Sequence, residues 1–118
     1  MALGNLDAEA RPARRELLDL LNDPVAPVRL TAARALFRMG EPEKALPVIR
    51  EQLSPDEEVW DVVYATRLAE QMGEAARPLS DELLQLIPLR YSPYRDAARS
   101  AMYALETLGI EAEFPERP

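Results

Sequence analysis

The sequence predicts an all-α fold of three helix-turn-helix units, and three observations support this prediction. Three of the four glycines, Gly40, Gly73 and Gly109, lie 33 and 36 residues apart, and each follows an amphipathic stretch. The phrase AEARPARRELLDLL at residues 8–21 recurs in similar form as EAARPLSDELLQLI at residues 74–87. No run of residues alternates apolar and polar side chains as a half-buried strand would.

The first helix of each unit is expected at residues 8–21, 43–53 and 75–87. Each of these segments has a proline near its start, where a proline in the first turn costs no hydrogen bond. Pro47 would lie later and would kink its helix if that helix began at Pro42. The links that follow carry turn residues and read NDPVAP, SPDE and YSP. The expected core positions are Leu17, Leu18 and Leu21; Leu46, Ile49 and Leu53; and Leu79, Leu83 and Leu86.

The second helix of each unit is expected to end at one of the three glycines. The segments read VRLTAARALFRMG, DVVYATRLAEQMG and AARSAMYALETLG. Small and apolar residues recur along one face of each segment, except at Asp61, where the other segments have an apolar residue. The expected core positions are Val28, Ala32, Ala35, Leu36 and Met39; Ala65, Leu68, Ala69 and Met72; and Ala97, Ala101, Ala104, Leu105 and Leu108.

These elements predict a single domain over residues 1–118, because a repeat of roughly thirty-five residues is typical of helical solenoids. We expect a short right-handed α-solenoid. Its units are expected at about residues 5–40, 41–73 and 74–110, with a tail at residues 111–118. The tail is acidic and contains prolines, so we expect it to be unstructured unless Phe114 packs over the last unit.

The composition argues against catalysis, metal binding and nucleic-acid binding. The chain has no cysteine and no histidine, which removes the commonest ligands of transition metals and the best proton carrier near neutral pH. Catalysis would depend on carboxylates, arginines, tyrosines or Lys44, and we expect no catalytic constellation, cofactor or metal site. The net charge is −7 and the basic residues are dispersed, so phosphate-rich partners would be repelled.

Membrane-spanning segments and calcium-binding loops are not expected either. No apolar run approaches the length of a membrane span, and the N-terminal residues do not read as a secretory signal. The neighbouring carboxylates at residues 56–58, and those of Glu111 and Glu113, lack the alternating spacing of a calcium loop. Glu57 and Glu58 are better explained as residues that stabilise a helix N-terminus.

The units resemble HEAT repeats. The resemblance is clearest in DPVAPVRLTAARALFRMG, where Asp23-Pro24, Val28-Arg29, and Ala32, Ala33 and Leu36 follow the second-helix pattern of that repeat. It covers nearly the whole chain and implies an α-solenoid, but HEAT arrays share no single function. Helical-repeat DNA glycosylases have a similar fold, yet they need a basic groove, and the charge of this chain has the opposite sign.

A narrower resemblance concerns the run VRLTAARALFRMGEPEKALPVIREQL followed by GEAARPL. These segments are similar to the helical-repeat extension at the C-terminal end of some bacterial sulfatases. The resemblance implies a scaffold or interaction module from a larger sulfatase-type hydrolase, located in the periplasm or secreted. The module itself would be non-catalytic, since it lacks the C/S-x-P-x-R segment of the sulfatase active site. The alternative is a free-standing cytoplasmic adaptor that binds a protein or peptide in its concave groove. No polar capping helix precedes the first unit, so a detached module would self-associate through its exposed end.

Two ladders of polar residues are expected on the concave face, because equivalent positions of stacked units lie side by side. The ladders contain Arg34, Arg67 and Tyr103, and Thr31, Tyr64 and Ser100. Arginines beside tyrosines suit a carboxylate-bearing or extended peptide through bidentate and stacking contacts. The interpretation that we favour is that these arginines pair with acidic neighbours such as Glu70 and cover apolar surface with their stems.

Trp60, the only tryptophan, has two interpretations. It is either an anchor for a partner, since tryptophan is frequent in binding hot spots, or a core plug between the first two units, which we slightly prefer. The candidate protein-binding residues are therefore Arg34, Arg67, Tyr103, Tyr64 and Trp60. The expected partner is another protein or the rest of a parent chain.

Overall fold

The computed structural model describes residues 13–112, apart from the side chains of residues 90 and 91, and every regular element in this range is helical. A helical stretch at residues 13–20 comes first. The elements after it are α2 (Ala26–Arg38), α3 (Pro42–Gln52), α4 (Val59–Met72), the 3₁₀ helix η1 (Gly73–Leu79), α5 (Ser80–Leu86), the 3₁₀ helix η2 (Ile87–Tyr91) and α6 (Arg95–Thr107). The predicted all-α fold is confirmed for these residues, and the predictions for the phrase at residues 8–12 and for Phe114 lie outside the described range.

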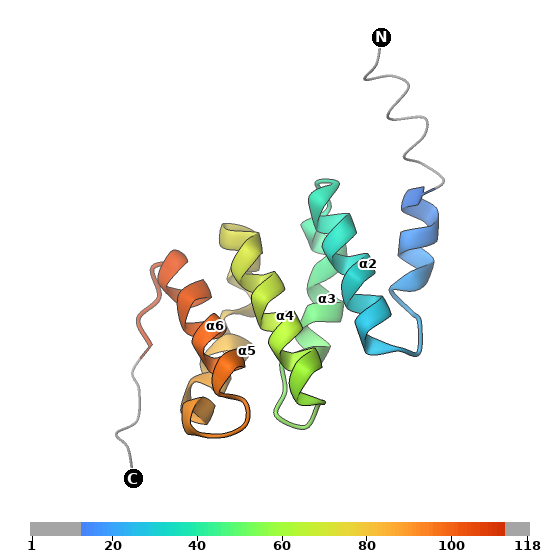
Figure 1. Ribbon diagram of the computed structural model, residues 1–118. Coiled ribbons are helices and arrows are strands. Elements are labelled where there is room, and N and C mark those ends of the chain that lie inside the picture. The colour runs from blue at the N-terminus through green and yellow to red at the C-terminus, as the bar shows by residue number, and fades with distance from the viewer. Residues whose placement is uncertain (1–12, 113–118) are drawn as a thin grey trace.

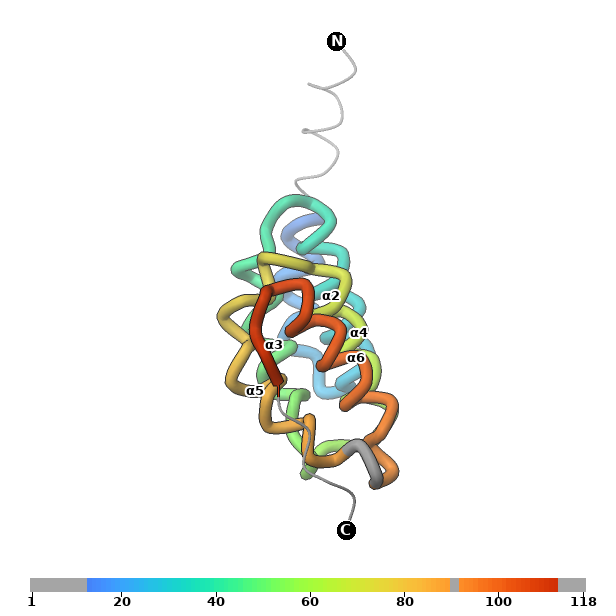
Figure 2. Tube along the Cα trace, turned by 90° about the vertical axis from the view of Figure 1, so that its left-hand side faces the viewer, coloured from blue at the N-terminus to red at the C-terminus, as the bar shows by residue number. Residues whose placement is uncertain are grey.

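The helices form two layers. Helices α2, α4 and α6 lie side by side in one layer, and α3 and α5 lie behind them in the other (Figure 1; Figure 2). Within the first layer α4 is central, because it contacts α2 on one side and α6 on the other. Helix α3 packs mainly against α2 and also touches α4, so the layers are joined by contacts between consecutive helices.

The three predicted glycine positions end the helices of the first layer. Gly40, Gly73 and Gly109 have positive φ angles of 88°, 57° and 73°, which side chains with a Cβ rarely adopt. After Gly40, the amide of Glu41 donates to the carbonyl of Leu36 at 2.9 Å, and the glycine amide itself donates to the next carbonyl along. The same pair of bonds surrounds Gly109, so α2 and α6 both end in a Schellman motif.

The first helices differ from the prediction. The single helix expected at residues 75–87 is instead the series η1, α5 and η2. Pro78 lies inside η1, and a proline removes an amide donor and clashes with the carbonyl four residues earlier, so the chain adopts the tighter turn before it. Helix α3 begins at Pro42, so Pro47 lies in its interior rather than in its first turn.

The core lies between the two layers and contains most of the predicted positions. All predicted positions of α4 and α6 are buried, as are Ile49, Leu53, Leu79, Leu83 and Leu86. The predicted stripe of α2 is partly wrong, because Met39 is 39% exposed and Leu30 and Ala33 are buried in its place. Helix α2 packs against both α3 and α4, which turns a broader face inward than a single stripe.

The leucines of the first helical stretch and Thr66 of α4 differ from this pattern of buried apolar side chains. The leucines of residues 17–21 are only partly covered, since that stretch has no further helix of the described chain on its outer side. Thr66 is fully buried, and its hydroxyl lies 3.1 Å and 2.9 Å from the carbonyls of Val62 and Val63, so its hydrogen-bonding capacity is met inside α4. Within residues 13–112, no helix combines the length and the apolar character needed to cross a lipid bilayer.

Candidate functional site

A hollow of about 440 Å³ opens on the layer of α2, α4 and α6. We call it the Arg-Trp hollow, and its lining residues are Arg34, Trp60, Val63, Tyr64, Arg67, Leu68 and Gln71. The structure thus brings together four of the five residues predicted from the sequence. The fifth, Tyr103, is 45% exposed on α6 and does not line the hollow.

One face of α4 forms most of the wall. Each lining residue of α4 between Trp60 and Gln71 has another lining residue three or four positions away, which places them all on one face of the helix. Leu68 and Val63 belong to this face and also reach the core, so the apolar base of the hollow is held by the packing between the layers. Arg34 reaches the hollow from the neighbouring helix α2.

Trp60 lies in water rather than in the core. Its side chain is 68% exposed, so the interpretation of Trp60 as a plug between the first two units is wrong. The reason is its position in the first turn of α4, where the helix has just left the loop and the ring points away from the packed face. A tryptophan ring carries a large apolar surface, and leaving it exposed forgoes the burial that a core position would provide.

The start of α4 is held from two sides. The side chain of Glu58 accepts hydrogen bonds from the amides of Trp60 and Asp61 at 2.9 Å and 3.3 Å, as its predicted role at a helix N-terminus requires. The hydroxyl of Tyr94, at the start of α6, lies 2.7 Å from the carbonyl oxygen of Pro55 and 2.9 Å from that of Glu57. The loop and first turn that present Trp60 are therefore fixed, although the ring itself is solvated.

The expected alignment of equivalent positions is found for one pair. Thr31 Oγ1 and Tyr64 Oη lie 3.5 Å apart on α2 and α4, although 33 residues separate them along the chain. The third member of that ladder, Ser100, is only 8% exposed and does not line a surface. The ladder therefore extends over two helices of the layer, and the prediction for Ser100 is wrong because α6 turns this position toward α4 and the core.

The two arginines of the hollow have no ion-pair partner within residues 13–112. The ion pairs of that range join Arg14 to Glu41, Arg50 to Glu82 and Arg77 to Glu74. The favoured interpretation, that Arg34 and Arg67 pair with acidic neighbours such as Glu70, is therefore wrong for the described part of the chain. A guanidinium without such a partner keeps its donors available to a ligand.

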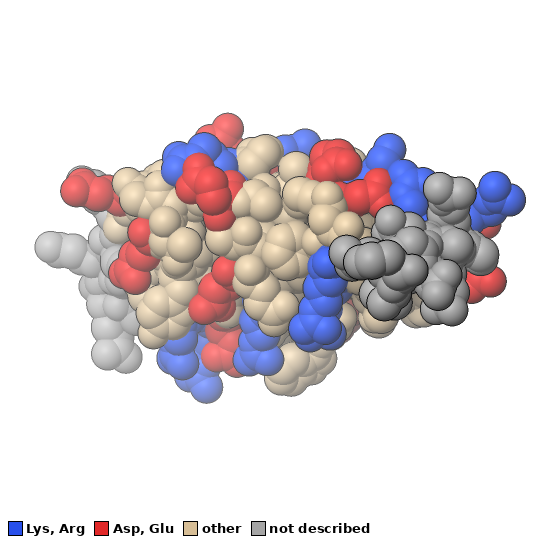
Figure 3. All heavy atoms as spheres, turned by 90° about the horizontal axis from the view of Figure 1, so that it is seen from above, with Lys and Arg blue, Asp and Glu red and all other residues tan. Residues whose placement is uncertain are grey.

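The charge is distributed unevenly between the layers. Helix α2 contains three arginines and no acidic residue, in a chain whose net charge is −7. Figure 3, which views the molecule from above, shows that Lys and Arg side chains predominate along its lower edge, which is the outer side of the α2, α4 and α6 layer. The Arg-Trp hollow therefore lies on the more basic side of an acidic protein.

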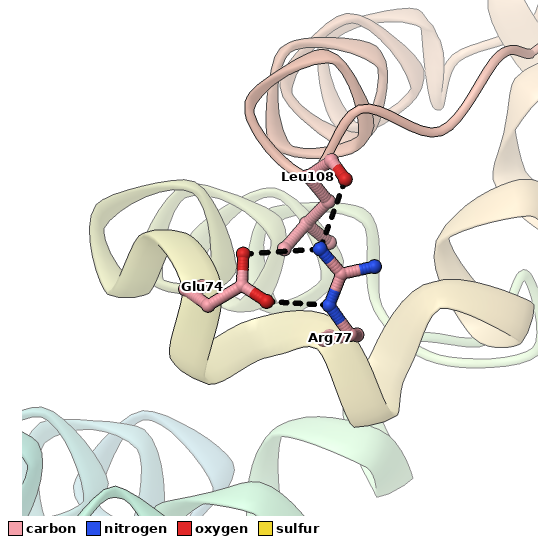
Figure 4. Close-up of polar contacts among 3 residues, drawn as sticks. All are labelled: Glu74, Arg77 and Leu108. Atoms are coloured by element: carbon pink, nitrogen blue, oxygen red, sulfur yellow. Dashed lines mark hydrogen bonds and ion pairs between the residues drawn. The ribbon is translucent and has the colours of Figure 1, made fainter.

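Two arginines elsewhere, Arg14 and Arg77, have structural contacts. Arg77 holds Glu74 and also donates to the carbonyl of Leu108 at 3.0 Å, which ties η1 to the end of α6 (Figure 4). The hydrogen bond from Arg77 holds the pKa of Glu74 below its ordinary value, and the hydrogen bond from Arg14 does the same for Glu41. The bonds from Arg77 to Leu108 and from Arg14 to Glu41 join segments 31 and 27 residues apart in the sequence.

A second hollow, of about 550 Å³, lies between residues 18–24, α2 and α3. Its charged lining residues are Asp23, Arg29, Lys44 and Glu51, two of each sign. One guanidinium nitrogen of Arg29 already donates to the backbone carbonyl of Asp23 at 2.7 Å, which closes the link before α2. The mixed charges and this internal bond indicate a structural role.

Sequence reasoning missed Val63, Leu68 and Gln71 in the hollow and Tyr94 behind it. The first three could have been found, because they lie three or four residues from Trp60, Tyr64 or Arg67 on the same helix face. Tyr94 had no such signal, since its partner carbonyls lie 37 and 39 residues away.

No group of three or more acidic side chains in the described range is arranged to hold a metal ion. Comparison of the chain with protein-family models, curated proteins and solved structures found no match.

Proposed function

We propose that this protein is a non-catalytic interaction module, a short right-handed α-solenoid of HEAT-like units, that binds a segment of another protein in the Arg-Trp hollow. The solenoid is supported by the regular glycine positions and by the separation of the helices into two layers. It is also supported by the contact between Thr31 and Tyr64, which occupy equivalent positions in adjacent units.

The observation that carries the proposal is the exposure of Trp60 beside the hollow. A tryptophan that is 68% exposed contributes little to the stability of its own fold. Tryptophan is the residue most enriched among binding hot spots, because it can transfer a large rigid surface from water to an interface. The first turn that presents it is fixed by Glu58 and Tyr94, so little conformational freedom is lost on binding.

Selection of binding peptides from a random-sequence display library tests this proposal. Selected peptides should bind the wild-type chain, and Trp60→Ala should weaken their binding by about thirtyfold, as loss of a hot-spot residue does. Tyr103→Ala is the matched control, because it removes another exposed aromatic ring that lies outside the hollow. Recovery of no binding peptide, or equal binding by Trp60→Ala, would exclude the proposed site.

A second candidate function is supported by two exposed apolar side chains near the start of the described chain. Leu20 and Val25 are 39% and 51% exposed, and both belong to the first unit. A module that packs against a larger parent, as the resemblance to the sulfatase extension implies, would cover such an end. Light scattering of the isolated chain tests this: self-association that Leu20→Gln with Val25→Gln abolishes is expected, and a stable monomer at high concentration would contradict it.

A further inference from the structure

We infer that the segment bound in the Arg-Trp hollow is acidic, with carboxylates that pair with Arg34 and Arg67 and an apolar or aromatic side chain that packs on Trp60. This inference rests on the proposed function and names the chemistry of its partner. Three properties of the hollow carry it: the available guanidinium groups, the contrast with the charge of the whole chain, and the exposed ring.

The guanidinium groups are the first property. Arg34 is partly buried at the wall of the hollow, Arg67 is exposed on the facing helix, and neither has an ion-pair partner among the described residues. A guanidinium has five donors in a planar fork, which matches the two oxygens of a carboxylate. Two such groups on neighbouring helices therefore suit a ligand with more than one carboxylate along an extended chain.

The contrast with the net charge is the second property. In a chain with 21 acidic and 14 basic residues, carboxylates outnumber the cations that could pair with them. Arg14, Arg50 and Arg77 have an ion-pair partner among the described residues, and Arg34 and Arg67 are among the arginines that have none there. Repulsion between the acidic chain and an acidic ligand is screened beyond about 10 Å at moderate salt, so the local arginines decide the interaction at contact.

The exposed ring is the third property, because it offers a large apolar surface to a group of the ligand. Trp60 and Tyr64 would stack on a base as well as on a side chain, and arginines also bind phosphates. A nucleic acid, however, presents a charge at every nucleotide along a surface much longer than the hollow, so most of its phosphates would lie beyond the reach of Arg34 and Arg67. An acidic peptide needs to place only a few charges beside an apolar side chain.

Fluorescence of Trp60 provides a direct measurement, since it is the only tryptophan of the chain. The probes are a short glutamate-rich peptide with one central phenylalanine and its analogue in which every glutamate is glutamine. The glutamate peptide should change the emission of Trp60 saturably, and the glutamine analogue should bind at least about tenfold more weakly. Arg34→Gln and Arg67→Gln should each weaken the glutamate peptide about fivefold.

Arg99→Gln is the matched control, because it makes the same charge change at an exposed position on α6 outside the hollow. Equal binding of the two peptides, or an equal loss in Arg99→Gln, overturns the inference, and so does tighter binding of a single-stranded oligonucleotide probe. The proposed function has a separate readout in the display library. If the selected peptides are neutral and still require Trp60, the inference of an acidic ligand is wrong, but the proposed binding site is retained.

Discussion

Two pairs of arginines, one in each helical layer, differ in what they contact. In and around the layer of α3 and α5, Arg50 binds Glu82 and the carbonyl of Pro78, and Arg77 binds Glu74 and the carbonyl of Leu108. In the layer of α2 and α4, Arg34 and Arg67 line a hollow and have no ion-pair partner in the described chain.

This difference separates two uses of one residue type. The paired arginines donate to backbone carbonyls 28 and 31 residues away in the sequence, which is a structural task. The arginines of the hollow lie beside an exposed tryptophan and contribute no such tie. Substitution of Arg50 or Arg77 should therefore affect stability, and substitution of Arg34 or Arg67 should affect recognition.

The largest expected effect comes from removing the core that joins the layers. Leu83 of α5 is fully buried, and Leu83→Ala should lower the free energy of unfolding by about 3 kcal/mol through lost burial and a residual cavity. Urea denaturation measures this. Leu84→Ala, at a partly buried position on the same helix, should cost clearly less; equal losses would mean that α5 does not face the core as described.

Tyr94→Phe should have the next largest effect, because it removes the hydroxyl that binds the loop before α4. We expect a loss of about 1 kcal/mol in the free energy of unfolding, the usual contribution of one hydrogen bond. Thermal denaturation gives the stability, and quenching of Trp60 by acrylamide reports whether the first turn of α4 has loosened. Unchanged stability and quenching would show that the loop is held by other contacts.

The comparison of arginines is tested directly by Arg50→Gln and Arg67→Gln. Arg50 donates to the carbonyl of Pro78 at 2.8 Å and lies 2.9 Å from Glu82, so its loss should cost about 0.5–1 kcal/mol. Arg67→Gln should change stability by less than about 0.5 kcal/mol, as substitutions at exposed positions without special contacts do. Chemical denaturation of both variants under one condition is the measurement, and the reverse order would refute the distinction between the layers.

The smallest expected effect is on how the stability of the fold depends on pH under acidic conditions. The pKa values of Glu41 and Glu74 are lowered in the folded chain from 4.5 by hydrogen bonds from Arg14 and Arg77. The folded state therefore binds fewer protons than the unfolded state, and the stabilisation is complete above pH 4.5 and is lost as the pH falls through the folded pKa.

Replacing both glutamates by glutamine should make stability less dependent on pH below 4.5. The change should be small, because both pairs are exposed to solvent and screened by it. Thermal melts between neutral and acidic pH measure it, and Glu106→Gln on α6 is a control at an exposed site outside these pairs. An unchanged pH profile in the double variant would show that these pairs do not form in solution.

Much of the fold could be predicted because its signals are local. The ends of α2, α4 and α6 were predicted from Gly40, Gly73 and Gly109, and the buried faces of α4 and α6 from their helical periodicity. The division of this segment into η1, α5 and η2 was not predicted. Whether Pro78 lies in a first turn or inside a helix depends on where the helix after α4 begins, and it begins directly at Gly73. Four of the five candidate binding residues do meet in one hollow, because Trp60, Tyr64 and Arg67 share one face of α4 and Arg34 reaches it from the neighbouring helix α2.

The sequence by itself determined the helices, their glycine ends and the row of side chains that α4 presents, because these depend on residues within a few turns of one another. Only the tertiary structure decided that Trp60 faces water, that Arg77 reaches Leu108 while Arg67 meets no carboxylate in the described chain, and that Tyr94 secures the loop before α4. Those outcomes depend on which surfaces meet when the layers pack, and a side chain of given chemistry is equally compatible with either result until its neighbours are placed.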